Sequence, residues 1–216
     1  PELGGVTAEE MKTEFARQGR YTAGMATKYT PSTLTGTDEH QGLATGFEIG
    51  TRFHSAPVTR VADARRYQLG HVHKADGRYR IYAFADEGGT ALREFTQWLS
   101  DSPDAPTQRF RAEGEDIDVA VDVHAIFPLP HHDVDVMDLP EVLLPKTGPF
   151  GLQDWEKVWA LEYKGENIFD TRGISAEGAV VVVRPDQYVA HVLPLSVRGE
   201  LTEFLGQALT AQNVAV

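Results

Sequence analysis

The chain has 216 residues, of which 41% are hydrophobic and 24% charged, an ordinary composition for one large globular domain. It contains no cysteine, which excludes disulfides, thiolate metal sites, cysteine nucleophiles and dithiol redox chemistry in this chain. The formal net charge is −12, and residues 101–141 carry eleven Asp and Glu against only Arg109 and Arg111. Such an acidic surface repels phosphate backbones, so no nucleic-acid partner is expected.

The N-terminus has neither the basic start nor the apolar core of a signal peptide, and eighteen apolar residues never occur in a row. We therefore expect a cytoplasmic protein with no membrane partner. The sequence begins at Pro1 without a methionine, so we also expect a piece of a longer protein. Whether that piece arose by design, by proteolysis or as a separate gene product is left open.

The first predicted element is a helix over residues 7–18. Thr7 and Glu10 have the spacing of a capping box, in which each side chain bonds the backbone amide of the other residue. The helix is expected to end near Gly19, because glycine is favoured just beyond helix C-termini.

Residues 30–50 are rich in Gly, Thr and Ser, which predicts an extended connection with a linker at residues 36–45. The turn dipeptide Asp76-Gly77 precedes the strongest strand signal and predicts a hairpin there. Residues 90–100 place apolar side chains on one helical face and predict a helix. The three strand signals lie at residues 57–62, 67–73 and 78–85.

Residues 116–127 alternate Ile and Val with Asp, Ala and His, the period of a half-buried strand with one wet face. We interpret the acids Asp116, Asp118 and Asp122 as solvated charges that discourage edge-to-edge pairing. A pair of catalytic carboxylates is the alternative interpretation.

A Pro-rich, irregular stretch at residues 128–150 is followed by a predicted amphipathic helix at residues 151–160, with Leu152, Trp155 and Trp159 on one face. Because this helix lies in an insertion, we interpret the three side chains as interface candidates rather than as a ligand cage.

Residues 179–195 read AVVVVRPDQYVAHVLPL. Four consecutive valines are apolar on both faces of a strand, as in sheets that helices cover on both sides. Pro185 suits the second position of a type I turn, so the segment predicts a core hairpin with His191 in its second strand. A helix over residues 196–209 closes the chain.

From residue 78 the predicted order is strand, helix, strand, insertion, hairpin and helix, which resembles the thioredoxin order. The string IYAFADEGGTALREFTQWL is similar to the thioredoxin strand, active-site turn and first helix, with residues 87–90 where a CxxC motif would lie. The family's cis-proline would fall within residues 173–183, which contain no proline. The predicted fold class is therefore α/β, a thioredoxin-like mixed sheet flanked by helices, without CxxC or cis-proline.

A second resemblance covers nearly the whole chain and is carried by five strings: QGRYTAGMATKY (18–29), GTRFHSAPVTRVADAR (50–65), LGHVHKADGRYRIYAFAD (69–86), ENIFDTRGI (166–174) and VVVVRPDQYVAHVLPL (180–195). Together they resemble the C-terminal part of the FAD-dependent aromatic-ring hydroxylases of the phenol 2-monooxygenase and 3-hydroxybenzoate 4-monooxygenase type. The resemblance implies that residues 1–35 are the tail of the FAD and substrate part, and that residues 46–216 form a thioredoxin-like domain without redox cysteines.

That domain is expected to act in subunit association and stabilisation, in a homodimer and against the upstream FAD and substrate domains, rather than in catalysis. The resemblance implies a parent enzyme that uses FAD and NAD(P)H to hydroxylate a phenolic ring. No G-x-G-x-x-G fingerprint follows a strand in this chain, so we assign it no catalytic or cofactor-binding residue. The phenolic substrate, the choice of NADH or NADPH and the oligomer size are left open.

Eight histidines in a cysteine-free chain raise a different class of function, a free-standing metal- or ligand-binding α/β protein. In that alternative His71 and His73 project from one face of a strand and are the candidate ligands. Because His-x-His lacks the full spacing of a known metal motif, no metal site is assigned.

Overall fold

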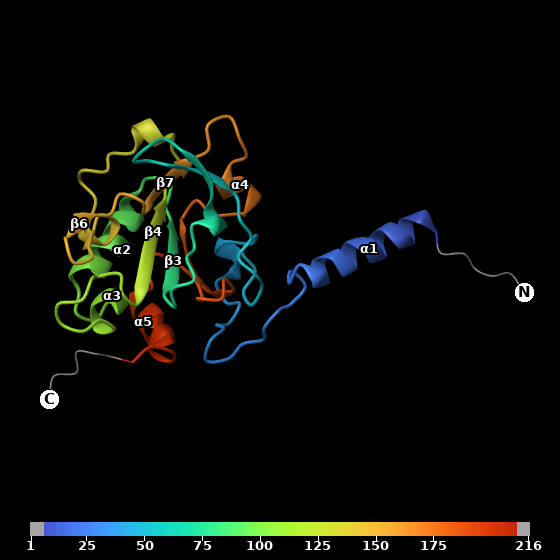
Figure 1. Cartoon of the computed structure of the whole chain (residues 1–216), viewed down its shortest axis with the longest axis horizontal. Coiled ribbons are helices and arrows are strands. Elements are labelled where there is room, and N and C mark those ends of the chain that lie inside the picture. Colours follow the sequence, from blue (N-terminus) through green and yellow to red (C-terminus); the bar gives the residue numbers. More distant parts are fainter. Residues whose placement is uncertain (1–6, 211–216) are drawn as a thin grey trace, which may run out of the picture.

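The computed structural model describes residues 7–210 (Figure 1). Its first element, α1 (Ala8–Thr22), has Thr7 as N-cap, and the predicted capping box with Glu10 is confirmed. The helix runs on to Thr22 rather than ending near Gly19. It buries none of its residues and extends away from the rest of the chain (Figure 1).

Seven strands form one mixed sheet in the order β2-β1-β7-β4-β3-β8-β9. β7, β4 and β3 run parallel at its centre, and the other neighbouring pairs are antiparallel. The strands are β1 (Pro57–Arg60), β2 (Arg66–Gln68), β3 (Tyr79–Phe84), β4 (Val121–Ile126), β7 (Val158–Leu161), β8 (Ala179–Val183) and β9 (Val189–Leu193). A separate antiparallel hairpin pairs β5 (Lys146–Thr147) with β6 (Leu152–Gln153).

The remaining helices are α2 (Thr90–Asp101), α3 (Pro106–Arg109), α4 (Ile168–Thr171) and α5 (Arg198–Gly206). Short 3₁₀ turns occur at Gln41–Leu43, Leu69–His71, His131–Asp133 and Glu141–Leu143. Within the sheet, the strands β4-β3-β8-β9 lie side by side, with α2 between β3 and β4 in sequence and α5 after the β8–β9 hairpin. This is the thioredoxin arrangement, so the predicted fold class is confirmed.

Both faces of the central sheet are covered. Helices α2, α3 and α5 and the turn at Glu141–Leu143 pack on one face. The other face is covered by α4 and by the irregular segment at residues 44–56, whose Phe47 and Phe53 rings stack 4.6 Å apart. All of β8 is fully buried, so the four valines lie in the core as predicted, although irregular chain rather than helix covers most of the second face.

The hairpin predicted at Asp76-Gly77 is wrong. β2 pairs with β1, whereas β3 lies between β4 and β8. The carboxylate of Asp76 accepts hydrogen bonds from Arg78, just before β3, and from Arg80 within β3. Asp76 and Gly77 therefore lead into β3 and do not form a turn that pairs it with β2.

The half-buried strand predicted at residues 116–127 is also wrong. β4 is shorter, and all six of its residues are buried. Asp118 and Asp122 are only 6% and 5% exposed, so the face predicted to be wet carries buried charge. Buried carboxylates require cationic partners, which the structure supplies as Arg80 in β3 and Lys157 immediately before β7.

The amphipathic helix predicted at residues 151–160 does not form. The segment divides into β6 and β7, and β7 pairs in parallel with β4 through Val158 and Trp159. Lys157 and Trp159 face one side of the sheet while Val158 faces the other, a period of two. Backbone pairing with β4 makes this segment a strand rather than a helix, because the amides of Ala125 and Phe127 donate hydrogen bonds to its carbonyls.

The segment before β1 packs along the β8–β9 hairpin. The ring of Tyr29 meets that of Tyr188 edge-on at 4.9 Å, and the Arg184 guanidinium lies 4.7 Å from the Tyr29 ring centre. Amides of Gly36 and Gly50 donate to carbonyls of β9 and cover that sheet edge. In residues 7–210, no helix combines the length and apolarity that a membrane crossing requires.

Candidate functional site

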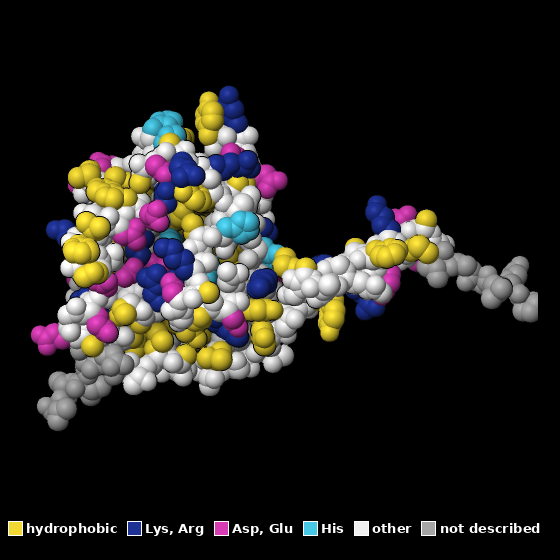
Figure 2. All heavy atoms as spheres, in the orientation of Figure 1, with side chains coloured by type: hydrophobic (Ala, Val, Ile, Leu, Met, Phe, Trp, Pro, Cys, Tyr) yellow, Lys and Arg dark blue, Asp and Glu magenta, His cyan; other side chains and the backbone are white. Residues whose placement is uncertain are grey.

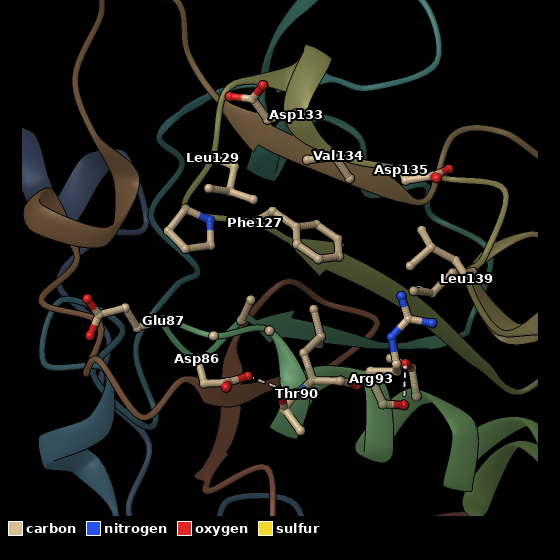
Figure 3. Close-up of a pocket in the computed structure, with 17 residues that line it drawn as sticks. Asp86, Glu87, Thr90, Arg93, Phe127, Leu129, Asp133, Val134, Asp135 and Leu139 are labelled. Carbon is tan, nitrogen blue, oxygen red and sulfur yellow. Dashed lines mark hydrogen bonds between the residues drawn. The ribbon is translucent and has the colours of Figure 1, made fainter.

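The turn from β3 into α2 occupies the place where thioredoxins carry their dithiol. Here it reads Asp86-Glu87-Gly88-Gly89 (Figure 3). Gly89 is the N-cap with φ of +70°, and the Asp86 carboxylate accepts the Leu92 amide at 3.1 Å. A carboxylate thus satisfies a free amide of the helix start and interacts favourably with the helix dipole.

A backbone hydrogen bond closes this turn against the approach to β8. The amide of Glu87 donates to the carbonyl of Ala176 at 3.0 Å. At the nearby Gly178, φ is +79° and an added Cβ would lie 2.7 Å from the Phe84 carbonyl oxygen. The two segments that frame a thioredoxin active site are therefore joined to each other, and the described residues contain no cis peptide bond.

A cavity of about 260 Å³ lies beside the turn, between α2, the end of β4 and the insertion that follows it (Figure 3). Apolar side chains such as Leu92, Phe127 and Leu139 form much of its wall. The Arg93 guanidinium, also in the lining, donates to the Asp138 carbonyl at 2.8 Å. No thiol, imidazole or amine lines the cavity, so it has room for a small apolar group but offers no redox couple or strong nucleophile.

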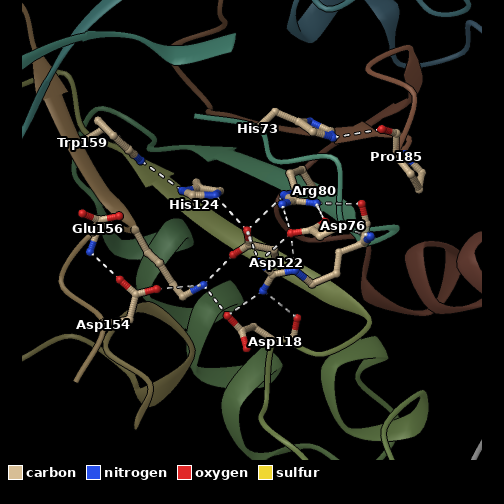
Figure 4. A network of polar contacts seen from close by, with 12 residues as sticks. His73, Asp76, Arg80, Asp118, Asp122, His124, Asp154, Glu156, Trp159 and Pro185 are labelled. Carbon is tan, nitrogen blue, oxygen red and sulfur yellow. Dashed lines mark hydrogen bonds and ion pairs between the residues drawn. The ribbon is translucent and has the colours of Figure 1, made fainter. Parts of the chain in front are cut away.

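A second cluster, of buried charges, lies at the amino ends of β3 and β4 (Figure 4). Asp122 is 3.0 Å from Arg80 Nε and also accepts from the Lys157 ammonium. Lys157 donates in turn to Asp118 at 2.8 Å. Arg80 makes two bonds of 2.7 Å to Asp76, a bidentate pair. The cluster joins β3, β4 and β7 through opposite charges.

Burial alone would raise the pKa of Asp122, but His124 and Lys157 more than offset it, so the pKa of this carboxyl lies well below its usual range. Burial likewise lowers the pKa of Lys157, yet Asp122 and Asp118 raise it above its usual value overall. Both groups stay charged at neutral pH. Their mutual neutralisation is typical of a structural ion-pair network rather than of an acid and base poised near pH 7.

His124 connects this network to the aromatic core. The Trp159 indole can only donate, and it donates to His124 Nδ1 at 3.1 Å. The hydrogen of the neutral imidazole must therefore sit on Nε2, which faces the Asp122 carboxylate at 3.3 Å. Trp159 thus fixes the tautomer that donates to Asp122.

The histidines of the metal alternative are not brought together. His71 ends a 3₁₀ turn and is exposed, so the predicted strand with both rings on one face is wrong. His73 is buried, and its Nε2 lies 3.2 Å from the Pro185 carbonyl oxygen. Across residues 7–210 no group of three or more His, Asp or Glu has the arrangement needed to hold a metal ion.

The interface candidates separate in the structure. Trp159 is fully buried in the core, whereas Leu152 and Trp155 are 69% and 40% exposed. Sequence reasoning missed Arg80 and Lys157, which belong to the network. The one available signal was the position of these two charges, Arg80 inside the otherwise apolar β3 and Lys157 immediately before β7.

Comparison with known proteins adds the decisive observation. Residues 27–213 match the family model described as the phenol hydroxylase, C-terminal dimerisation domain. The chain belongs to this family. The dimerisation domain is therefore thioredoxin-like, and the resemblance stated from the sequence is confirmed.

The curated relatives that the chain matches agree with this family assignment. The chain is 47% identical over 216 residues to a 3-hydroxybenzoate 4-monooxygenase of Comamonas testosteroni, covering 96% of this chain and 34% of that protein. It is 28% identical over 229 residues to an FAD-dependent monooxygenase, terD, of Aspergillus terreus, covering 99% of this chain and 37% of that one. The dimerisation domain thus spans about a third of the length of the curated relatives it matches.

Solved structures overlap with it more loosely. The solution structure of a putative protein disulfide isomerase from Bacteroides thetaiotaomicron has a TM-score of 0.47 and 12% identity, covering 74% of this chain and 87% of that one. The fold assignment accordingly rests on the strand order and connections of the dimerisation domain itself.

Proposed function

We propose that this dimerisation domain is a redox-inactive thioredoxin-like module of an FAD-dependent aromatic monooxygenase, acting in subunit association and stabilisation rather than in catalysis. The observation that carries the proposal is the β3–α2 turn. In place of a dithiol it has a carboxylate that caps α2 and a backbone bond from Glu87 to Ala176. A thioredoxin mechanism needs a thiolate nucleophile, and the chain has no cysteine.

We infer that the described residues hold no FAD. The one Gly-rich string, residues 36–50, opens no α-helix, and its Phe47 and Ile49 are buried in the core. Dinucleotide sites of the Rossmann type need a glycine turn between a strand and a helix N-terminus. We therefore place the FAD site in upstream domains of the parent protein, together with the use of NAD(P)H and the hydroxylation of a phenolic ring.

The exposed face of helix α1 supports a docking role toward those upstream domains. Residues 1–35 are proposed as the tail of the FAD and substrate part, residues 36–45 as the linker and residues 46–216 as the thioredoxin-like domain. Helix α1 exposes Met11 and Phe15 by 50% and 68%, as expected for a helix that is covered only in the whole enzyme. The whole protein is proposed to be a cytoplasmic homodimer.

The test is association with a separately produced flavin part. The flavin part of the Comamonas relative, expressed without its last third, is mixed with this chain and followed by gel filtration, flavin retention and thermal melting. We expect co-elution and a raised melting temperature of the flavin part, with no disulfide reductase activity of the chain on insulin. Failure of the chain both to self-associate and to bind the flavin part would count heavily against the proposal.

A further inference from the structure

The β5–β6 hairpin carries apolar side chains that the described residues leave exposed. Phe150 is 86% exposed, Leu152 69% and Trp155 40%. Val119, 40% exposed, lies in the loop to which the hairpin is hydrogen-bonded through Asp116. Hydrophobic side chains gather on the surface at the edge where β6 lies (Figures 1 and 2). We call Val119, Phe150, Leu152 and Trp155 the hairpin patch.

The hairpin patch is held on an ordered support. The Gly148 amide donates to the Asp116 carboxylate at 2.8 Å, and the Asp154 amide donates to the Pro145 carbonyl at 2.8 Å. Strands β5 and β6 pair with each other between these two anchors. A surface that is already ordered loses little conformational entropy when it binds, so its apolar contacts contribute more fully to affinity.

Two of the carboxylates beside the hairpin patch have cationic partners within the chain. Asp154 lies 3.5 Å from the Lys157 ammonium, and Glu156 pairs with Arg60. The exposed Lys146 adds a positive charge. Because the chain has a net charge of −12, two copies repel each other wherever unpaired carboxylates meet. The four side chains of the hairpin patch are themselves uncharged and add nothing to that repulsion.

We propose that the hairpin patch is the centre of the contact with a second copy of this chain, with the two patches facing each other across a twofold axis. The inference rests on the association role proposed above and specifies its partner and surface. The family to which the chain belongs is a dimerisation domain, which argues for a second copy as the occupant. A twofold contact is self-complementary, so an apolar patch can face the same patch on a second copy.

Aromatic and leucine side chains at the centre of the contact are expected to supply most of the binding energy. The test compares sedimentation of the chain with that of the double variant Phe150→Asp/Leu152→Asp. Two carboxylates from each copy would meet at the contact, so the dimer dissociation constant should rise about 100-fold or more. The control is Tyr163→Asp, because Tyr163 is 69% exposed like Leu152 but lies on the loop after β7. It should leave the dimer unchanged.

Each result has a distinct meaning. If the double variant dimerises as tightly as the parent chain, this surface is wrong while the association role stands. A parent chain that is monomeric at every concentration removes the association role and this inference with it. Equal dissociation by Tyr163→Asp would show that added charge alone is responsible and overturn the specific contact. Loss of binding only to the flavin part would assign the patch to the upstream domains instead.

A second measurement leaves the patch intact. Because the chain has no cysteine, a single introduced thiol can form a disulfide only with another copy. Pro149→Cys, next to Phe150, should give a covalent dimer on mild oxidation at micromolar concentration, and Tyr163→Cys should not. Equal or reversed yields would contradict the proposed twofold contact, whatever the aspartate variants do to folding.

Discussion

Asp122 is the residue on which the buried charges depend most. Its carboxylate faces Arg80, Lys157 and His124 and is only 5% exposed. Removing one partner of a buried ion pair leaves the others uncompensated, at a cost of about 3 to 5 kcal/mol. We therefore expect Asp122→Asn to lower the free energy of unfolding by about that amount in urea titrations. Asp186→Asn, which removes a surface partner of Arg184, should change it by less than about 0.5 kcal/mol.

The same carboxyl gives stability a pH dependence with a defined sign. The pKa of Asp122 in the folded chain lies below that of an unfolded aspartate, about 4. The folded state then binds fewer protons, so this contribution is fully present above about pH 4 and is lost as the pH falls through the folded-state pKa. The parent chain should lose stability steeply below pH 4, and Asp122→Asn should lose it less steeply. Parallel curves for the two proteins would contradict this.

A substitution at Gly178 tests how closely the segment before β8 approaches the turn after β3. Its φ is +79°, and a Cβ there would meet the Phe84 carbonyl oxygen at 2.7 Å and the Asp86 amide nitrogen at 2.8 Å. Gly114 has a similar φ of +83° with no atom within 4 Å of an added Cβ. Gly114→Ala should cost only the backbone penalty of about 1 to 2 kcal/mol. Gly178→Ala should cost clearly more in thermal melting, and equal costs would show that the approach is not tight.

The burial of apolar residues could be predicted from the sequence, whereas the burial of charged residues could not. The four valines were predicted to be buried because their own side chains carry the signal. Asp118 and Asp122 were predicted to be solvated, because their counterion Lys157 lies 39 and 35 residues away and no local pattern reports it. Burial of charge depends on partners that only the fold brings together.

Among the elements, α1 and β8 differ most in burial. Helix α1 buries nothing, and a helix of 15 residues is only marginally stable without packing. We expect deletion of residues 1–22 to change the free energy of unfolding by less than about 0.5 kcal/mol, whereas Val182→Asp, in the fully buried β8, should abolish folding. Chemical denaturation followed by circular dichroism compares the two. A large loss on deletion would mean that α1 packs on the domain.

Element type was predicted best where capping or continuous burial decided it. The capping box of α1 and the valines of β8 are local signals. Residues 151–160 failed because the spacing of Leu152, Trp155 and Trp159 imitates a helical face, while parallel pairing with β4 imposes a strand on the second half. The hairpin at Asp76-Gly77 failed for a similar reason, since the partner of β3 is chosen by the whole sheet.

For the whole molecule, the predicted order of elements and the string IYAFADEGGTALREFTQWL resembled thioredoxin, and the fold that this resemblance implied is confirmed. The empty dithiol position followed from composition alone. The proposed association surface could not be predicted in full, because Phe150 lies in a short hairpin whose exposure depends on how residues 144–156 return to the sheet. Leu152 and Trp155 were named for a helix that does not form, yet they lie on the exposed hairpin patch.

Sedimentation equilibrium of this chain at neutral pH over a wide concentration range tests the central claim most directly. We expect a reversible monomer–dimer equilibrium whose heavier species has twice the chain mass of 23.8 kDa, shifted strongly to monomer by Phe150→Asp/Leu152→Asp. A single 23.8 kDa species at all concentrations would contradict it.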